Sequence, residues 1–510
     1  MCDEVELERA TEVDDRRISR RLLLGMGAAG LAGIVLPSTS SATAAASEAL
    51  RNQPNSDRLL LRGGVVLTLD PTTGDLPEGD VLIENGKISA VGTRIPIQGA
   101  EVIDASGMIV MPGFVDTHRH MWQGLIRNTG ADDLLGDYLA KVLFGFAPVM
   151  RPDEVYLGNL VAALSAMNAG ITTLLDWSHI ATTPEHTDAA IQALRDAKVR
   201  AVYGYGPNFG LAPPWFENPN QPYPDDIRRL RRQHFSSSDQ LLTLALAAAG
   251  PEFSSLEAAV REWTIAREVG ARISVHAGVG NPGKQGLLQA LSQRVQLAED
   301  TTYIHCSTLS DIEWRMIADT GGSVSLAIPV EMQMGHGMPP IQNARGVGIR
   351  PSLSVDVETN QPTDMFTQMH ACFALQRAHV NEKDLFPGTP PPGDLLTVRN
   401  VLEFATIEGA RANGLASKIG TLTPGKDADV ILLRAKAINV GPVNDPIGAV
   451  VLGMDTSNVD SVFIAGRPIK RNGQLVGVDV PQLLDRSAQA RDALLRRGRV
   501  SGASQAVIHS

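Results

Sequence analysis

Positive charge, cysteine and aromatic residues are all scarce in this chain. Its 45 Lys and Arg residues are outnumbered by 56 Asp and Glu residues, which leaves a formal net charge of -11. This balance argues against nucleic acid as a partner, because nonspecific binding to phosphates depends on a surplus of basic side chains. Aromatic residues make up only 5% of the chain, which also argues against a basic face interleaved with aromatics. The clusters RRLRR at 228–232 and RDALLRRGR at 491–499 are therefore expected to be solvated helix faces.

The N-terminal stretch, residues 1–46, is predicted to be a targeting segment. Arg20 and Arg21 precede a Gly- and Ala-rich apolar run and then small-residue sites that suit a peptidase. This pattern resembles a bacterial Tat signal, so we expect the Tat machinery as a partner and export to the periplasm or beyond. The run is short for a membrane span, and no later segment spans a membrane; an uncleaved anchor is the open alternative. After it only Cys306 and Cys372 remain, so no disulfide framework is expected.

The rest of the chain is predicted to contain a barrel flanked by strand-rich ends. Short strands separated by turns fill 58–111 and return at 416–480. Between them, at 112–415, apolar runs alternate with helical stretches. We expect an α/β fold, a (β/α)8 TIM-like barrel with a small composite β-sandwich domain built from both ends of the chain. A C-terminal helix or tail is expected at 481–510.

Eight apolar runs rich in β-branched residues are the candidate barrel strands. Their length and spacing are typical of buried parallel strands with helices between several of them. They are GFVDTH at 113–118, GITTLLD at 170–176, RAVYGYG at 200–206, LLTLALAAAG at 241–250, ARISVHAG at 271–278, TTYIHCS at 301–307, GSVSLAI at 322–328 and RPSLSVDV at 350–357.

Histidines and one aspartate stand at the ends of several of these runs. His118 and His120 end the first, His276 the fifth, His305 the sixth and Asp356 the eighth. The carboxyl ends of barrel strands meet at one mouth, and residues two apart on a strand share a side. Imidazole and carboxylate ligands favour zinc or an iron-like ion over calcium or magnesium. The spacing therefore predicts a divalent metal site, with zinc as the first choice and iron as the alternative.

The same segments resemble the amidohydrolase superfamily, in the branch of the cytosine/guanine deaminases and the triazine hydrolases, or chlorohydrolases. PGFVDTHRH, ISVHA, YIHCS, LSVD and the closing segment IGTLTPGKDADVILL carry the resemblance. It implies that His118, His120, His276 and Asp356 bind one metal and that His305 lies beside it. Binuclear members carry a lysine at the end of the fourth strand, and LLTLALAAAGPEF has none, so a single metal is expected. Homo-oligomers are common in the family, and one is an open expectation here.

The resemblance implies a metal-dependent hydrolase that activates water to attack a trigonal carbon of a small molecule. Asp356 would be the general base, and His305 would stabilise the developing charge. We expect an amidohydrolase-type enzyme acting on non-peptide carbon–nitrogen bonds, an aminohydrolase or deaminase of a heterocycle. Hydrolysis of an amide, a cyclic amide or a halide is the alternative. A non-catalytic exported binding protein is the remote one.

Two departures from the family pattern bear on the substrate. The deaminases place a glutamate three residues after the strand-five histidine, where this chain has Val279. Asp356 would then move the proton alone, or Glu252, Glu331 or Glu358 would substitute for the missing acid. The second departure is PVEMQMGHGMPP at 329–340, where the family often has P-x-S-N.

Candidate substrate-binding residues come from the segments that follow the strands. Aromatic and Pro-rich residues at 208–226 are expected to form a lid, and the candidates together suggest a flat or ring-bearing small molecule. The candidates are Trp122, Gln123, Trp177, His179, Glu331 and His336.

Overall fold

The computed structural model describes most of the chain after the predicted targeting segment. That segment lies outside the described residues. The described residues belong to one compact unit. They are residues 58–97, 99–218, 220–280, 286–384 and 394–500.

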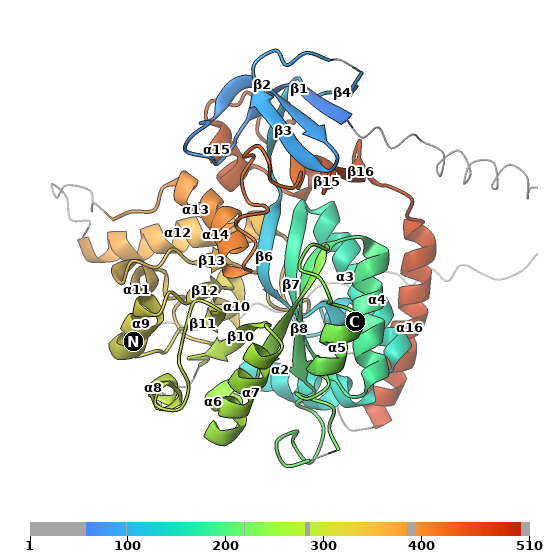
Figure 1. Ribbon diagram of the computed structural model, residues 1–510, viewed down its shortest axis with the longest axis vertical. Coiled ribbons are helices and arrows are strands. Elements are labelled where there is room, and N and C mark those ends of the chain that lie inside the picture. The colour runs from blue at the N-terminus through green and yellow to red at the C-terminus, as the bar shows by residue number, and fades with distance from the viewer. Residues whose placement is uncertain (1–57, 98, 219, 281–285, 385–393, 501–510) are drawn as a thin grey trace, which may run out of the picture. The chain divides into compact units, whose positions relative to one another are not determined.

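The eight apolar runs form eight neighbouring parallel strands in chain order (Figure 1). Their side chains are almost entirely buried, which explains why the runs read as continuously apolar rather than alternating. The strands are β6 (Phe114–Arg119), β7 (Ile171–Ala181), β8 (Arg200–Pro207), β9 (Leu242–Ala248), β10 (Arg272–Ala277), β11 (Thr301–His305), β12 (Ser323–Leu326) and β13 (Ser352–Leu353).

The first and last strands meet and close the barrel. Arg119 forms a parallel bridge with Asp356, just beyond β13. Asp356 donates its backbone N–H to the carbonyl of His118 at 2.8 Å, and the N–H of His120 donates back to Asp356 at 2.9 Å. The backbone bonds that close the barrel are therefore made by residues predicted to bind metal.

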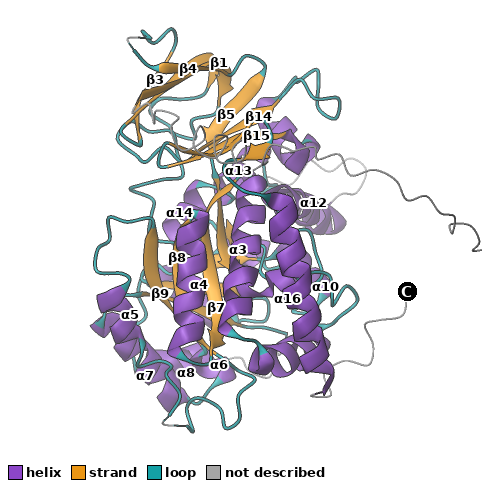
Figure 2. Cartoon of the chain, turned by 90° about the vertical axis from the view of Figure 1, so that its right-hand side faces the viewer, coloured by secondary structure: helices purple, strands orange, loops and turns teal. Residues whose placement is uncertain are grey.

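Helices follow most strands and cover the outside of the barrel. In Figure 2, α3 and α4 lie against β7 and β8, and α16 packs along α3. No helix among the described residues is long and apolar enough to cross a membrane. The α-helices are α2 (Leu135–Tyr138), α3 (Pro152–Asn168), α4 (Pro184–Ala197), α5 (Ile227–Gln233), α6 (Gly250–Phe253), α7 (Leu256–Glu268), α8 (Leu287–Ser292), α9 (Asp311–Asp319), α10 (Ile328–Gln333), α11 (Ile341–Gly346), α12 (Met365–Asp384), α13 (Val398–Phe404), α14 (Ile407–Ala412), α15 (Pro446–Gly448) and α16 (Val480–Val500).

Strands from both ends of the chain form a second, nine-stranded sheet (Figure 1). Pairing of β5 with β14 joins the two ends, and the order is β17-β16-β15-β14-β5-β1-β2-β3 with β4 beside β1. The predicted barrel with an added β domain from both chain ends is confirmed. The strands are β1 (Arg58–Val66), β2 (Leu76–Glu84), β3 (Lys87–Gly92), β4 (Glu101–Asp104), β5 (Met108–Pro112), β14 (Val430–Arg434), β15 (Val459–Ile464), β16 (Arg467–Arg471) and β17 (Gln474–Leu475).

Candidate active site

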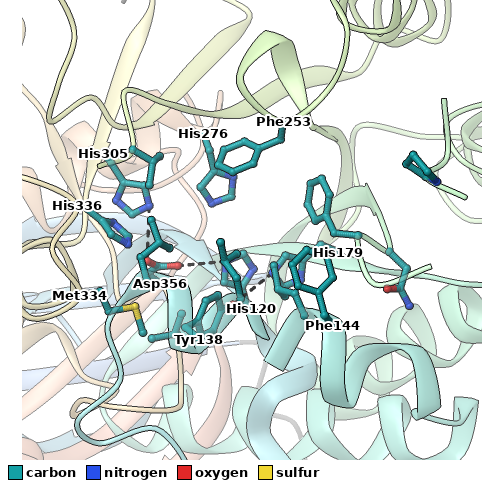
Figure 3. Close-up of a pocket in the computed structure, with 18 of the residues that line it drawn as sticks. His120, Tyr138, Phe144, His179, Phe253, His276, His305, Met334, His336 and Asp356 are labelled. Carbon is teal, nitrogen blue, oxygen red and sulfur yellow. Dashed lines mark hydrogen bonds and ion pairs between the residues drawn. The ribbon is translucent and has the colours of Figure 1, made fainter. Parts of the chain in front are cut away.

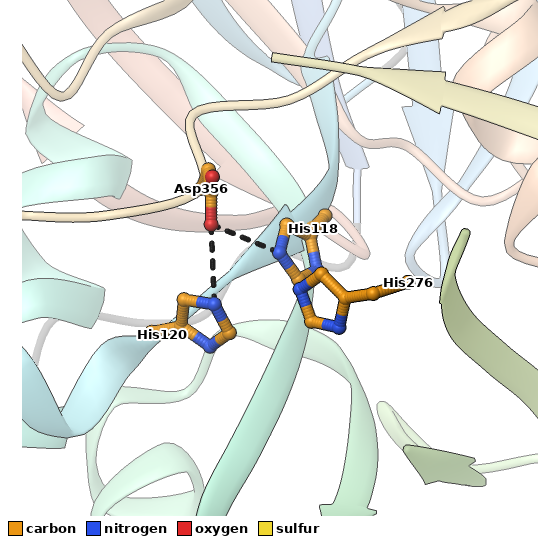
Figure 4. Close-up of side chains that lie close together, drawn as sticks. All are labelled: His118, His120, His276 and Asp356. Atoms are coloured by element: carbon orange, nitrogen blue, oxygen red, sulfur yellow. Dashed lines mark hydrogen bonds and ion pairs between the residues drawn. The ribbon is translucent and has the colours of Figure 1, made fainter. Parts of the chain in front are cut away.

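Four predicted metal ligands converge at the carboxyl end of the barrel (Figure 4). One donor atom from each of His118, His120, His276 and Asp356 lies within 4.8 Å of the other three. Asp356 Oδ1 is 3.0 Å from His118 Nε2 and 3.1 Å from His120 Nε2. Three imidazoles and one carboxylate at this separation match the ligand set of a catalytic zinc or iron-like ion.

Barrel geometry explains how residues far apart in the chain meet here. His118 lies near the end of β6 and His120 directly after it, while His276 comes from β10 across the mouth. Asp356 is fixed by the backbone bonds that close the barrel, and its φ of +68° lies in the left-handed region. His305, at the end of β11, has a φ of +70°. Non-glycine residues rarely adopt this conformation, and such strain gathers where a structure must aim a functional side chain.

The hydrogen bond of His120 indicates that a cation belongs between the ligands. Its Nδ1 lies 2.8 Å from the backbone carbonyl of Trp177, which can only accept, so Nδ1 carries the proton. In the neutral ring Nε2 then presents a lone pair to Asp356 Oδ1. A lone pair facing a carboxylate oxygen is repulsive unless a cation lies between them. The residues therefore fit a bound metal.

Burial keeps the ligands in the protonation states that metal binding requires. Desolvation lowers the pKa of His118 to about 3 and holds that of His276 well below its usual value. Burial alone would raise the pKa of Asp356, but the adjoining histidines, His118 foremost, outweigh it and hold this pKa well below 3.8. Neutral imidazoles and an ionised carboxylate are the forms that coordinate a divalent metal.

His305 joins this group to a buried glutamate behind it. Its Nδ1 lies 3.2 Å from Glu331 Oε1, and that oxygen also accepts the backbone N–H of Ala327 at 2.8 Å. Because Glu331 Oε1 already accepts a hydrogen bond from Ala327, we assign it as the acceptor for His305 as well, which places the ring proton on His305 Nδ1. His305 Nε2 lies 3.6 Å from Asp356 Oδ2 and faces it with a lone pair. Glu331, proposed from the sequence as a substrate-binding residue, thus supports His305 from outside the pocket lining.

The other two acids considered as substitutes for the missing glutamate are turned away from the pocket. Glu358 accepts from Arg119 Nε at 2.9 Å and from Arg127 Nε at 2.5 Å. Glu252 accepts the backbone N–H groups of Gly278 and Val279, at 2.7 and 3.0 Å. Neither carboxylate lines the described pocket. Glu358 pairs with two arginines, and Glu252 binds backbone N–H groups after β10. The alternation of side chains along a strand could not predict these partners.

Three of the four ligands, His120, His276 and Asp356, line a pocket of about 310 Å³ that is mostly apolar (Figure 3). Residues from the lid predicted at 208–226 line one side, and Val279 lies where the family glutamate would be. Among the described lining residues, Asp356 is the only carboxylate and none is lysine or arginine. The apolar lining is Leu135, Leu139, Leu143, Phe144, Phe209, Pro214, Trp215, Phe216, Phe253, Val279, Met334 and Val357.

Two predicted substrate contacts, Trp122 and Gln123, lie one layer behind the pocket. Trp122 Nε1 donates to His179 Nδ1 at 2.8 Å, and Gln123 Nε2 donates to Tyr138 Oη at 2.6 Å. His179 and Tyr138 both line the pocket. His179 Nε2 lies 3.5 Å from Tyr138 Oη, so its N–H faces that oxygen, and the hydroxyl proton of Tyr138 is left for a substrate. The buried pair Trp122 and Gln123 therefore orients two pocket residues, of which Tyr138 presents the donor.

Of the remaining predicted substrate-binding residues, one lines the pocket and one lies behind it. His336 lines the pocket beside His305 (Figure 3). Trp177 is fully buried in β7 and contributes its backbone carbonyl to His120. Sequence reasoning missed Tyr138 and Phe253, which enter the pocket from segments outside the strand ends. The one feature of the sequence that could have indicated them is that both lie in segments that connect barrel strands.

Comparisons with known proteins agree with this architecture. Residues 109–469, more than half of the chain, match the model of the Amidohydrolase family. The chain is 25% identical over 452 residues to 5′-deoxyadenosine deaminase of Methanosarcina mazei, covering 86% of this chain and 99% of that protein. An adenosine deaminase from Xanthomonas campestris, solved with bound zinc, matches with a TM-score of 0.74 at 20% identity over 86% of this chain and 98% of that one. Atrazine chlorohydrolase from Arthrobacter aurescens, complexed with zinc, matches with a TM-score of 0.73 at 22% identity over 85% and 100%.

The two solved structures share the fold of the chain, and the family model covers the whole barrel and its ligand-bearing strand ends. The prediction of a metal-dependent hydrolase acting on non-peptide carbon–nitrogen bonds is confirmed at the level of the family. The chain belongs to the amidohydrolase family.

Proposed function

We propose that this protein is an aminohydrolase that removes ammonia or an amine from an uncharged, ring-bearing small molecule. The observation that carries the proposal is the convergence of His118, His120, His276 and Asp356 at the base of an apolar pocket. These four residues would hold one divalent metal, with zinc as the first choice and iron as the alternative. When bound, the metal supplies Lewis acidity and lowers the pKa of water toward neutrality.

The chain's own residues then move the proton. Asp356 Oδ1 faces His118 and His120, which leaves Oδ2 to accept a proton from the attacking water. His305 Nε2, 3.6 Å from Oδ2, can receive that proton and deliver it to the departing nitrogen. Glu331 accepts from His305 Nδ1 and so stabilises the imidazolium formed between these transfers. This route needs no acid at Val279.

The lining of the pocket supports a substrate less polar than a nucleoside. Phe209, Trp215 and Phe253 offer flat apolar surface, and the exposed Phe144 and Phe216 extend it. Sugar hydroxyls buried here would lose water without gaining a charged partner other than Asp356 among the described lining residues. Tyr138, oriented by Gln123 and His179, provides a neutral donor for a ring nitrogen or carbonyl oxygen. We therefore place the substrate among aromatic amino-heterocycles rather than the nucleosides named for the relatives.

Val279 also favours a second candidate, hydrolysis of an amide, a cyclic amide or a ring halide. Its apolar side chain lines the pocket where a deaminase of this branch has a carboxylate. A halide leaves without a proton, so its departure would need neither that carboxylate nor His305. The solved chlorohydrolase shows that the fold accommodates a protein named for such chemistry.

A release assay distinguishes the two candidates. Zinc-loaded protein is incubated with matched amino- and chloro-substituted aromatic heterocycles, and ammonia and chloride are measured in parallel. The proposal predicts ammonia release that is lost in Asp356→Asn. Chloride release without ammonia would select the second candidate, and release of neither from a metal-loaded protein would overturn both.

We also propose export by the Tat route, supported by Arg20 and Arg21 ahead of the apolar run. A metal site assembled before export suits a route that carries folded proteins. Replacing Arg20 and Arg21 by lysines should retain the full-length chain in the cytoplasm of a Tat-competent host. Unchanged export of that variant would contradict the proposal.

A further inference from the structure

A second group of possible metal donors lies beside the first and shares one residue with it. Donor atoms of His305, His336 and Asp356 lie within 4.8 Å of one another, and all three side chains are buried. Figure 3 shows His305 and His336 on the side of Asp356 away from His120. Asp356 has two carboxylate oxygens, of which Oδ1 faces His118 and His120 and Oδ2 faces His305.

His336 has no described partner for either of its ring nitrogens. The residue is 3% exposed, and both nitrogens are buried without a hydrogen bond to any described residue. Its backbone is anchored, because His336 N donates to the carbonyl of Glu331 at 3.2 Å and Gly280 N donates to the carbonyl of His336 at 2.9 Å. Its ring meets His305 edge to face, with centroids 4.6 Å apart. Since buried polar groups are nearly always satisfied, this ring lacks a ligand.

His305 has the hydrogen bonding typical of a metal-binding histidine. Its Nδ1–H points at the Glu331 carboxyl group, as the second nitrogen of a ligating imidazole commonly does. Nε2 is left with a lone pair that faces Asp356 Oδ2 at 3.6 Å. As at His120, a lone pair opposite a carboxylate oxygen calls for a proton or a cation between the two.

We propose that His305, His336 and Asp356 Oδ2 form a second, weaker divalent-cation site that inhibits the enzyme when filled. Two imidazoles and one carboxylate select zinc-like ions. With three protein donors rather than four, the site should fill only after the first. Asp356 would then bridge two cations. The inference rests on the proposed function, because it assigns Oδ1 of Asp356 to the first metal.

Inhibition follows from the atoms that this site would occupy. A cation there uses Asp356 Oδ2 and His305 Nε2, the two atoms that carry the proton in the proposed mechanism. Because His305, His336 and Asp356 all line the pocket, the cation would also take up space that the substrate needs. Turnover should therefore fall as the second cation binds.

The experiment measures zinc per chain by elemental analysis after equilibrium dialysis against rising free zinc. The wild type, His336→Ala and His370→Ala are compared, because His370 is an exposed histidine of α12 outside both donor groups and controls for surface binding. Ammonia release is followed on the same samples. The proposal predicts one zinc per chain in all three proteins at low free zinc. It predicts a rise to two in the wild type and in His370→Ala, with falling turnover, and no rise in His336→Ala.

Other outcomes overturn the inference. A wild type that stays at one zinc per chain refutes the second site and leaves the proposed function standing. A second zinc taken up equally by His336→Ala would place it elsewhere and refute the assignment. A wild type that binds no zinc refutes the proposed function as well. If His336→Ala fails to fold, a wild type that stays at one zinc per chain still refutes the second site.

Discussion

The indole of Trp122 donates a hydrogen bond to Nδ1 of His179 at 2.8 Å, which places the ring proton on Nε2, 3.5 Å from Tyr138 Oη, and so leaves the Tyr138 hydroxyl proton for a substrate. Trp122→Phe keeps a buried aromatic ring but removes the donor, so His179 is free to change tautomer. We expect kcat/KM to fall about tenfold, the order of one lost hydrogen bond to substrate. Zinc content should stay unchanged. Steady-state kinetics with elemental analysis tests this, and full activity in the variant would remove Trp122 from the site.

Loss of the metal should destabilise the protein as well as inactivate it. Bound metal stabilises the folded state by mass action, and without it the buried Asp356 faces the Nε2 lone pair of neutral His120. Chelator treatment should lower Tm, and added zinc should restore both Tm and turnover. His118→Ala should lower Tm in the same way but fail to respond to zinc. A Tm that ignores chelation and zinc in the wild type would contradict the metal assignment.

Arg119 is predicted to be a structural residue, although it stands between two predicted ligands. It lies fully buried, with Nε 2.9 Å from Glu358 Oε1 and Nη1 3.2 Å from Asp116 Oδ2. Arg119→Met would leave two buried carboxylates short of a partner. We expect the free energy of unfolding to fall by about 3–5 kcal/mol.

Denaturant unfolding measures the effect of Arg119→Met. Arg228→Met is the matched control, because Arg228 pairs with Asp225 and Glu268 at an exposed position. Its loss should cost no more than about 1 kcal/mol. An equal loss of unfolding free energy in the two variants would contradict a structural role for the buried ion pairs of Arg119.

Lys470 in β16 should make stability depend on alkaline pH. Its Nζ donates to the backbone carbonyl of Asn168 at 2.8 Å, and burial lowers its pKa from 10.5 to about 8. Between these values the unfolded chain holds a proton that the folded chain has lost, so stability rises with pH across this window. Relative to Lys470→Met, the wild type should gain up to about 3 kcal/mol from pH 7 to pH 10.5.

Urea unfolding of both proteins across that pH range tests the prediction. Lys87→Met, at an exposed position of the same sheet, is the control for general alkaline effects. A difference between wild type and Lys470→Met that stays flat, or that shrinks as pH rises, would contradict the assigned burial of the ammonium group.

Strand periodicity was sufficient to bring His118, His120, His276 and Asp356 together. Parallel strands of a barrel end at one mouth, so a polar residue at the end of an apolar run is placed by topology alone. The same rule placed His305. The sheet formed from both chain ends was predictable because each end contains short strands bounded by turns. Pairing of β5 with β14 joins the two sets of strands.

Hydrogen-bond partners were not predictable from spacing. Glu358, two residues after Asp356, was considered as a pocket acid, yet Arg119 and Arg127 hold it elsewhere. The positive φ of Asp356 breaks the alternation on which that count depended. Trp122 and Gln123, predicted to contact the substrate, lie behind His179 and Tyr138. The position of Tyr138 depends on how a connecting segment folds over the barrel mouth, which strand spacing does not determine.

The most direct test of the account is a zinc titration of metal-free protein with ammonia release followed on an amino-heterocycle substrate. The account predicts no turnover without metal and a rise in proportion to zinc up to one equivalent per chain. Asp356→Asn should show neither tight zinc binding nor turnover. Full turnover by the metal-free wild type, or tight zinc binding that Asp356→Asn retains, would contradict the central claim.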